Sequence, residues 1–362
     1  MSRETIPLTF RPMQATEQDA SSFGACFAAE GQARALEAIR WQYLENPAAA
    51  PIVHFAVDPT GEAEAEAGEG SIAGIYAVQM VRMRVDGELR LAAQSVDTLV
   101  GSAYRGQGLF VRLAEQTYRR CAEAGVDFVY GFPNGNSAHG FFNRLGWSTL
   151  DPVPFMIRPL RIGFALSKLG LELPRLGDLR LPCGRPRLEK DEEFRDVMAF
   201  GPEFDALWGR FAEGIGVAIE RDAQYLRWRC RDKPGHRYQT IGLYRAGQLV
   251  AYAILIVANK HGGRVGYLLE LLHAPGDRRA GDAVMRAALG RMSALGADAA
   301  LAWNLPGSPN RGSHLRAGFL PLPERLRPIE LHFGVLGLRP PEPRPLANRA
   351  SWYLSYCDSD TV

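Results

Sequence analysis

The sequence has little net charge and no long apolar run. Its 362 residues include 42 Lys and Arg against 40 Asp and Glu, for a formal net charge of +2. This balance gives no global basic field, so we expect neither a nucleic-acid partner nor an anionic membrane surface. No stretch reaches the roughly 18 consecutive apolar residues of a membrane span. The opening MSRETIPLTFRPM lacks the basic and apolar segments of a signal peptide, which predicts a cytoplasmic protein.

Cysteine is scarce and shows no ligand spacing. The five cysteines form neither a CxxC pair nor a Cys/His cluster: Cys26, Cys121, Cys183, Cys230 and Cys357. This distribution favours free buried thiols in a reducing compartment over a disulfide framework or a zinc site. The histidines also lack metal-ligand spacing, so we expect no metal site. No Ser/His/Asp triad stands out either.

What the sequence does contain is a repeat. A chain of 362 residues suits two domains of ordinary size, and several landmarks occur twice in the same order. IRWQYLENP resembles LRWRCRDKP, YRGQGLFVRLAEQ aligns with DRRAGDAVMRAAL, and the segment 122–147 resembles 293–319. Between these landmarks, each half has alternating runs with Asp-Gly or Gly-Gly turns, which are typical of antiparallel hairpins. We therefore predict the same α/β unit twice.

The repeat sets the expected domain boundaries. We assign residues 1–160 to an N-terminal unit and residues 193–337 to a C-terminal unit. The segment 161–192 is a connector that is too apolar for a solvated linker. Residues 338–362 form a proline-rich strap with a strand-like WYLSY, and the acidic EAEAEAGEGS at 62–71 is a low-complexity loop.

The stretch VDTLVGSAYRGQGLFVRLAEQ, at residues 96–116, predicts a buried strand, a tight turn and an amphipathic helix. Gly106 and Gly108 have no Cβ, so the backbone can turn sharply and a ligand can approach its N–H groups. Free N–H groups at the positive end of the helix dipole form an anion site, for which phosphate is well suited. The apolar helix face consists of Leu109, Leu113, Tyr118 and Cys121.

Motif and surroundings together resemble the GNAT superfamily of acyl-CoA N-acyltransferases. The family signature [Q/R]-x-x-G-x-[G/A] binds the coenzyme A pyrophosphate at a helix start. Arg105-Gly106-Gln107-Gly108-Leu109-Phe110 matches it at Arg105 and Gly108, but Phe110 stands where the family has Gly or Ala. In the second half, Arg278–Ala283 matches the short pattern fully, yet it lacks the second turn glycine and places Asp282 where phosphate would bind.

The resemblance implies a fold and a division of roles. The fold would be α/β (of the α+β type), with two tandem GNAT-like domains, each a mixed, mainly antiparallel sheet flanked by helices. The N-terminal unit would bind acetyl-CoA and be catalytic, and the C-terminal unit would be degenerate.

The resemblance also implies roles for the strand before the turn. The pantetheine arm would lie along residues 97–100, pairing near Leu99 and Val100, while a backbone N–H polarises the thioester carbonyl. Asp97 lies eight residues before Arg105, and Glu270 lies eight before Arg278. Family members commonly use a carboxylate on this strand as the base that deprotonates the amine. Asp97 is therefore a candidate base, and the alternative is a strand-end acid paired with an arginine.

Further candidates follow the next strand. Asn134 and Ser137 fit the family's N-x-x-[AS] and would contact the cofactor. The tyrosine that often protonates the departing thiolate would stand at Phe142, which has no proton to give, so His139 is the nearest titratable candidate. The alternative for His139 is a structural role. Trp41 and Trp228 are expected to be core aromatics, with the acceptor groove as their alternative place.

These inferences predict an enzyme that transfers an acetyl group from acetyl-CoA to a primary amine of a small molecule. The tandem layout is similar to bacterial GNAT proteins that act on antibiotic or polysaccharide amines, which suggests an amino sugar. One alternative is a Fem-type aminoacyl transferase. Another is a non-catalytic coenzyme A-binding or scaffold protein, which Phe110 and Phe142 favour. The oligomeric state is not predicted.

Overall fold

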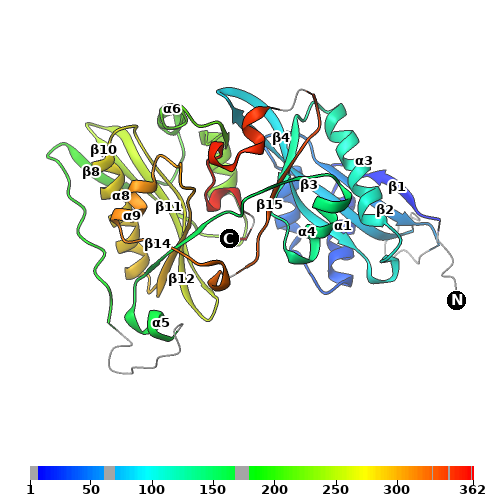
Figure 1. The fold of residues 1–362 in the computed structure, drawn as a ribbon, viewed down its shortest axis with the longest axis horizontal. Helices are drawn as coiled ribbons and strands as arrows, with labels where there is room; N and C mark the ends of the chain where they lie inside the picture. The colour runs from blue at the N-terminus through cyan, green and yellow to red at the C-terminus, as the bar shows by residue number, and fades with distance from the viewer. Residues whose placement is uncertain (1–6, 61–69, 168–178, 328, 341–342, 360) are drawn as a thin grey trace.

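The structure is a computed structural model that describes residues 7–60, 70–167, 179–327, 329–340, 343–359 and 361–362. Within these residues, the strands form two sheets that lie in two adjacent units (Figure 1). This confirms the predicted two-unit α/β organisation. Most of the acidic loop (62–69) and part of the connector (168–178) lie outside the described residues.

The first sheet is antiparallel except for the neighbours β4 and β5, which are parallel. Its order along the sheet is β1 (Thr9–Pro12), β2 (Ile52–Asp58), β3 (Ser71–Val85), β4 (Glu88–Val100), β5 (Phe128–Gly131), β15 (Phe333–Gly337) and β6 (Ser148–Leu150). The short β9 (Val217–Ile219) adds to β3. A β3–β4 hairpin turns at Asp86 and Gly87, both with positive φ, as the Asp-Gly pair predicts.

The second sheet repeats this plan, with a single parallel pair between β12 and β13 among its described strands. Its order is β14 (Leu320–Pro321), β7 (Phe155–Pro159), β13 (Ala299–Trp303), β12 (Gly263–His273), β11 (Gln248–Lys260), β10 (Gln239–Arg245) and β8 (Glu192–Asp196). Both sheets are thus mixed and mainly antiparallel, as expected.

Helices cover both faces of each sheet. In the first unit, α1, α2 and the π-helical turn η1 pack on one face, and α3 and α4 pack on the other. In the second unit, α8 and the pair α6 and α7 lie on opposite faces. The bounds are α1 (Glu17–Ala29), α2 (Leu36–Ile39), η1 (Arg40–Leu44), α3 (Leu109–Glu123), α4 (Gly135–Arg144), α5 (Ile162–Ser167), α6 (Pro202–Phe211), α7 (Ala223–Leu226), η4 (Arg227–Arg231), α8 (Arg278–Ala294) and α9 (Arg311–Arg316).

The two units exchange strands. β7 follows β6 directly in the chain, yet it pairs with β13 of the second sheet. β15 comes from the end of the second unit and lies between β5 and β6 of the first sheet; Figure 1 shows it in the same unit as β3 and β4. Sheet membership therefore crosses the predicted ranges 1–160 and 193–337 at β7, β15 and the short β9, which pairs with β3. Because the two sheets are built alike, each offers the same edge to either strand, and the sequence pattern does not distinguish them.

An approximate two-fold axis runs between Trp41 and Trp228. Their rings stack with centroids 4.6 Å apart. The Trp41 Nε1–H donates to the Trp228 carbonyl at 2.8 Å, and the Trp228 Nε1–H donates to the Trp41 carbonyl at 2.9 Å. Each residue lies in the equivalent π-helical segment of its unit, η1 or η4, and each side chain is buried. Both tryptophans are buried in the core, as expected, and Trp41 also lies at a cavity described below.

The strand-like WYLSY forms no regular strand. Trp352 makes an isolated bridge with Val217, and Tyr356–Asp358 is a 3-10 helix. Trp352 packs edge-on against Phe333 and Phe128, and the segment wedges into the hydrophobic cluster shared by the two units. The apolar pattern here therefore reflects burial on all sides rather than sheet pairing.

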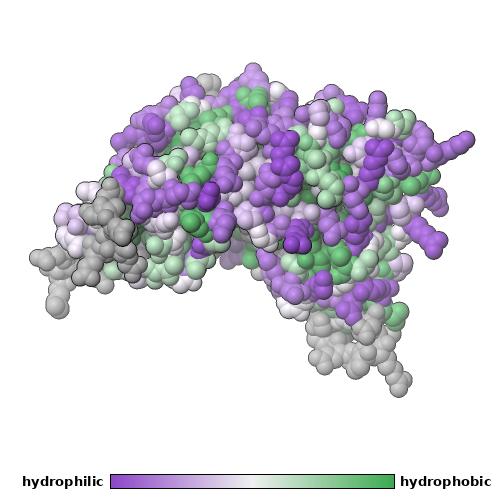
Figure 2. Space-filling view, turned by 180° about the vertical axis from the view of Figure 1, so that it is seen from behind, coloured by the Kyte–Doolittle hydropathy of each residue, from purple (hydrophilic) through white to green (hydrophobic). Residues whose placement is uncertain are grey.

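The face seen in Figure 2 is mainly hydrophilic, with small hydrophobic areas between the charged side chains. Its lower outline is indented at the junction of the two units. In the part of the chain that the structure describes, no helix is both long and apolar enough to cross a membrane.

Candidate active site

β4 separates from β5 where the candidate residues begin. Pairing between the two strands runs from Ala92 to Ser95 of β4 and then stops, although β4 continues to Val100. Next to this point, the pairing register of β3 with β4 shifts at Tyr76–Val78 of β3. Such a shift is typical of a β-bulge, which bends a strand. The edge of β4 that faces β5 is therefore open to a ligand from Val96 to Val100, including Leu99.

The turn before α3 leaves its backbone accessible. Gly106 and Gly108 have φ of 81° and 70°, and a Cβ at either would meet nothing within 4 Å. Gly108 is the N-cap residue of α3, and among the described residues no side chain accepts a capping hydrogen bond from the first N–H groups of this helix. The N–H groups of Leu109 and Phe110 begin the helix, where no earlier carbonyl can accept them. Together with Gln107, they form a site that fits an anion such as pyrophosphate. Arg105 beside them is exposed and pairs with the Glu30 carboxylate at 3.2 Å.

Phe110, the residue that departs from the family pattern, packs toward α4. Its ring lies edge-on to Phe141 with centroids 5.3 Å apart, and it also contacts Tyr76. Gly140 of α4 makes room for it, because a Cβ there would lie 2.8 Å from the Phe110 ring. A large residue at this position is thus compensated by a small one on the neighbouring helix.

Gly140→Ala is therefore expected to destabilise the protein by about 1–3 kcal/mol, because overpacking outweighs the helix propensity that alanine adds. Gly209→Ala in α6 is the matched control, since its Cβ would meet no atom within 4 Å; it should be neutral or slightly stabilising. Chemical denaturation measures both. Adding Phe110→Leu to Gly140→Ala should recover part of the lost stability. Equal losses of stability for Gly140→Ala and Gly209→Ala would contradict this packing.

Asn134 and Ser137 already bond to one another and to the start of α4. The Asn134 side chain caps the helix by accepting from the N–H groups of Asn136 and Ser137, and the Ser137 hydroxyl donates back to Asn134. His139 is exposed on α4, and Phe142 lies beside His332. The cofactor contacts of Asn134 and Ser137 and a catalytic role of His139 stay predictions.

Asp97 pairs with an arginine. The Arg34 guanidinium and the Tyr43 hydroxyl both donate to Oδ2 of Asp97. The distance from the Tyr43 hydroxyl oxygen to Oδ2 is 2.6 Å. Burial, and then the negative charge of Asp97, raises the pKa of Tyr43 well above its ordinary value, so the hydroxyl stays a donor. The ion pair anticipated for a strand-end acid is therefore present, and the base role of Asp97 stays a prediction.

The second unit repeats this pair in a buried form. Glu270 accepts from Arg221 at 3.0 Å, and both side chains are 0% exposed. Arg34 and Arg221 each stand seven residues before the stacked tryptophan of their unit. The repeat therefore extends to an arginine–carboxylate pair that the sequence comparison missed, although equal spacing to Trp41 and Trp228 was the signal that could have found it.

The helix start that corresponds to the anion site is occupied in the second unit. α8 begins at Arg278, so the matching Arg278–Ala283 lies inside its first turns rather than in a loop. Asp277 caps the helix, accepting from the Ala280 N–H at 2.9 Å. Asp282, which sequence reasoning placed among phosphate ligands, is instead bound by Arg316 and Ser313. The carboxylate of Asp277, rather than that of Asp282, fills the position of an anion.

The strand edge is closed in the second unit as well. Pairing of β12 with β13 ends at Leu268, but residues 269–273 are all buried, whereas most of residues 96–100 in β4 are partly exposed. Beyond that point, the Asn310 side chain donates to the Leu271 carbonyl at 2.6 Å. An internal side chain thus takes the hydrogen bond that a ligand would make.

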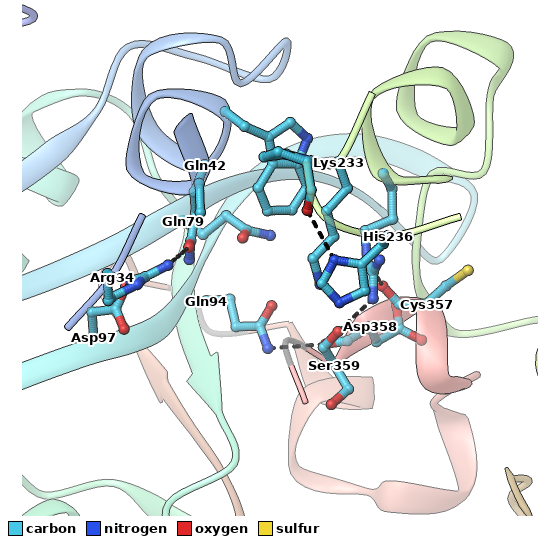
Figure 3. A pocket seen from close by; sticks show the side chains of 14 residues that line it. Arg34, Gln42, Gln79, Gln94, Asp97, Lys233, His236, Cys357, Asp358 and Ser359 are labelled. Atoms are coloured by element: carbon cyan, nitrogen blue, oxygen red, sulfur yellow. Dashed lines mark hydrogen bonds and ion pairs between the residues drawn. The ribbon is translucent and has the colours of Figure 1, made fainter. Parts of the chain in front are cut away.

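A cavity of about 300 Å³ lies between the two units, on the α1 side of β4 (Figure 3). We call it the interunit cavity. Its lining includes Arg34, Trp41, Gln42, Gln79, Gln94 and Asp97 from the first unit, and Arg229, Lys233, His236 and Cys357–Ser359 from the second unit and the C-terminal segment. Sequence reasoning singled out Trp41 and Asp97 but missed the glutamines and the second-unit residues, because the strand exchange and the two-fold packing bring them together.

Comparison with known proteins agrees with this geometry. A family model for an acetyltransferase (GNAT) domain matches residues 10–150. A GCN5-related N-acetyltransferase from Anabaena variabilis has a similar structure, with 12% identity and a TM-score of 0.62 over 91% of this chain and 73% of that one. N-myristoyltransferase of Saccharomyces cerevisiae with bound myristoyl-CoA is similar at 11% identity and a TM-score of 0.58, over 93% and 81% of the chains.

A third similar structure is described as a glucosamine N-acetyltransferase region of a fungal multi-domain GH3 β-N-acetylglucosaminidase. It has 15% identity and a TM-score of 0.56, over 92% of this chain and 38% of that chain. At such identities these structures show a shared fold and nothing more. No curated protein matches the sequence.

Proposed function

Because residues 10–150 of this chain are a GNAT acetyltransferase domain, we propose that the protein transfers an acetyl group from acetyl-CoA to a primary amine of a small molecule. The observation that carries this proposal is the contrast between the units. The first has an uncapped helix start beside an open strand edge, and the second has both positions filled by its own side chains.

The residues of the first unit fit the co-substrate. The N–H groups at Gly106–Phe110 and the Arg105 guanidinium would hold the pyrophosphate, and the edge of β4 at Val96–Val100 would pair with the pantetheine amides. Bound acetyl-CoA supplies the activated acyl group. A backbone N–H of β4 would stabilise the charge that develops on the carbonyl oxygen.

The interunit cavity is the proposed acceptor site. Its volume of about 300 Å³ lies at the small end of small-molecule pockets. Gln42, Gln79 and Gln94 line it beside Asp97. Gln42 already accepts from Arg34, and Gln94 donates to the Asp358 carbonyl, so Gln79 supplies the side-chain amide that can both donate to and accept from a hydroxyl group. This lining suits an amino sugar, and the similar fungal structure is described as a glucosamine N-acetyltransferase region. The second unit would thus complete the acceptor site instead of binding cofactor.

Calorimetry with acetyl-CoA and a thiol-release assay over a panel of amines test the proposal together. We expect one acetyl-CoA site per chain and thiol release that depends on a primary amine, with glucosamine ahead of simple alkylamines. Binding without release by any amine would instead support a coenzyme A-binding scaffold. No acetyl-CoA binding at all would remove the acyl-CoA proposal and leave the aminoacyl transferase alternative to be tested with aminoacyl-tRNA.

A further inference from the structure

His236 lies on the wall of the interunit cavity that the second unit supplies. It follows η4 in the chain and faces Gln94 and Asp97 of β4 across the cavity (Figure 3). Its Nδ1 is 3.0 Å from the Pro234 carbonyl oxygen. Since a carbonyl can only accept, Nδ1 carries the hydrogen and Nε2 keeps its lone pair in the neutral ring. The Tyr238 ring stacks on the imidazole at 5.5 Å and fixes its plane.

The surroundings favour the neutral form of His236. Burial lowers its pKa below the ordinary value; the bond to Pro234 opposes this shift, and the charges of Lys233, Arg229 and Lys260 add to it. The two acidic residues at the cavity are each paired with an arginine: Asp97 with Arg34, and the fully buried Asp358 carboxylate with Arg221. This pairing offsets their attraction for an imidazolium. The ring is therefore uncharged near neutral pH and can take up a proton.

We infer that His236 is the general base that accepts a proton from the acceptor amine in the interunit cavity. This inference rests on the proposed function and adds to it a catalytic group from the unit that does not bind cofactor. A primary amine is mostly protonated near neutral pH, because its pKa is about 10, and it cannot attack a carbonyl until a base removes that proton.

Protons and electrons balance in this transfer. Nε2 of His236 takes one proton from the ammonium group, and the freed lone pair forms the C–N bond to the thioester carbonyl carbon while the C–S bond breaks. The second proton lost by the nitrogen goes to the coenzyme A sulfur. His236 returns its proton to solvent. The products are the amide, the free thiol and one released proton.

The repeat explains why this group occurs once. His236 stands eight residues after Trp228, and the residue eight after Trp41 is Ala49. The same comparison sets Lys233 of the second unit against Asn46 of the first. The two units have thus diverged at complementary places, because the first keeps the open cofactor cleft and the second carries the base.

His236→Gln tests the inference through the pH dependence of kcat. In the parent protein, kcat should rise with pH through the pKa of His236 and then level off. The variant should lose about 10²-fold or more in kcat near neutral pH, with its rising limb moved toward the pKa of the amine and its KM for acetyl-CoA unchanged. Imidazole should partly restore His236→Ala. His261→Asn, in the exposed turn between β11 and β12, is the histidine control and should behave as the parent.

A second readout needs no turnover. Long-range ¹H–¹⁵N correlations of the protein alone should show a set of imidazole signals that disappears in His236→Gln and that has its hydrogen on Nδ1 at neutral pH. The same tautomer is expected for His273 and His314, whose Nδ1 atoms also lie beside backbone carbonyls, so the variant makes the assignment. An Nε2–H tautomer or a charged ring would overturn the inference. The inference would also be overturned if His236→Gln kept the pH dependence of kcat. If Asp97→Asn abolished that dependence instead, the role of base would return to Asp97. If the parent protein released no thiol with any amine, the proposed function itself would fall, and this inference with it.

Discussion

Acetyl-CoA binding is expected to weaken by on the order of 100-fold or more when Gly108 is replaced by aspartate. Gly108 has φ of 70° and caps α3 without a side chain, so a carboxylate placed there would sit beside the helix start. Two unit charges about 4 Å apart repel by about 4 kcal/mol at an effective dielectric of about 20. The variant would thus acquire the arrangement that closes the second unit, where Asp277 caps α8. Isothermal titration calorimetry measures the loss.

Gly276→Asp is the matched control for this change. Gly276 has φ of 76°, and a Cβ there would meet nothing within 4 Å, as at Gly108; it precedes the equivalent helix α8. The new side chain meets a similar backbone strain without touching the proposed site, so acetyl-CoA affinity should be unchanged. Gly281 is unsuitable, since a Cβ there would collide with His273. If Gly276→Asp abolished binding and Gly108→Asp did not, the cofactor would belong to the second unit.

Arg221→Ala is expected to lower the free energy of unfolding by about 3–5 kcal/mol. Arg221 is 0% exposed and lies between Glu270 and Asp358, which are also 0% exposed. Its removal leaves two buried carboxylates without their counter-charge. The free-energy cost of burying these two carboxylates is then no longer offset by the arginine, unless a carboxylate takes up a proton. Denaturant unfolding at neutral pH measures the effect.

Arg34→Ala is the comparison that the repeat offers. Arg34 and Asp97 are 22% and 16% exposed, so water replaces part of the lost interaction. A partly exposed pair contributes only about 0–1 kcal/mol, and we expect a loss near that range. Equal losses for the two arginines would contradict the account of one buried and one solvent-accessible copy.

The sequence predicted much of the fold, because the decisive signals were local. The stretch at 96–116 forms β4 and α3, with Leu109, Leu113, Tyr118 and Cys121 buried as expected. The spacing around Trp41 and Trp228 identified equivalent elements. The exchange of β7 and β15 could not be predicted in this way, since pairing with either sheet satisfies the same apolar alternation.

The candidate site was predictable only where it depends on backbone conformation. Gly106 and Gly108 indicate an open turn, and the structure has one. The sequence analysis rightly set aside Arg278–Ala283 despite its full match, but it placed Asp282 at the phosphate position, because a short pattern does not show whether its residues lie before a helix or inside it. His236 carried no spacing signal at all. Its place opposite Asp97 results from the two-fold packing of the units, which brings residues distant in sequence to one cavity.

A crystal structure with bound coenzyme A tests the central claim most directly. We predict that the pyrophosphate lies at the start of α3, near Gly106 and Gly108, and that the pantetheine arm runs along β4 from Val96 to Val100 with its thiol toward the interunit cavity. The cleft between β12 and β13 should remain filled by Asn310. Coenzyme A at the start of α8, or bound away from β4, would contradict the account.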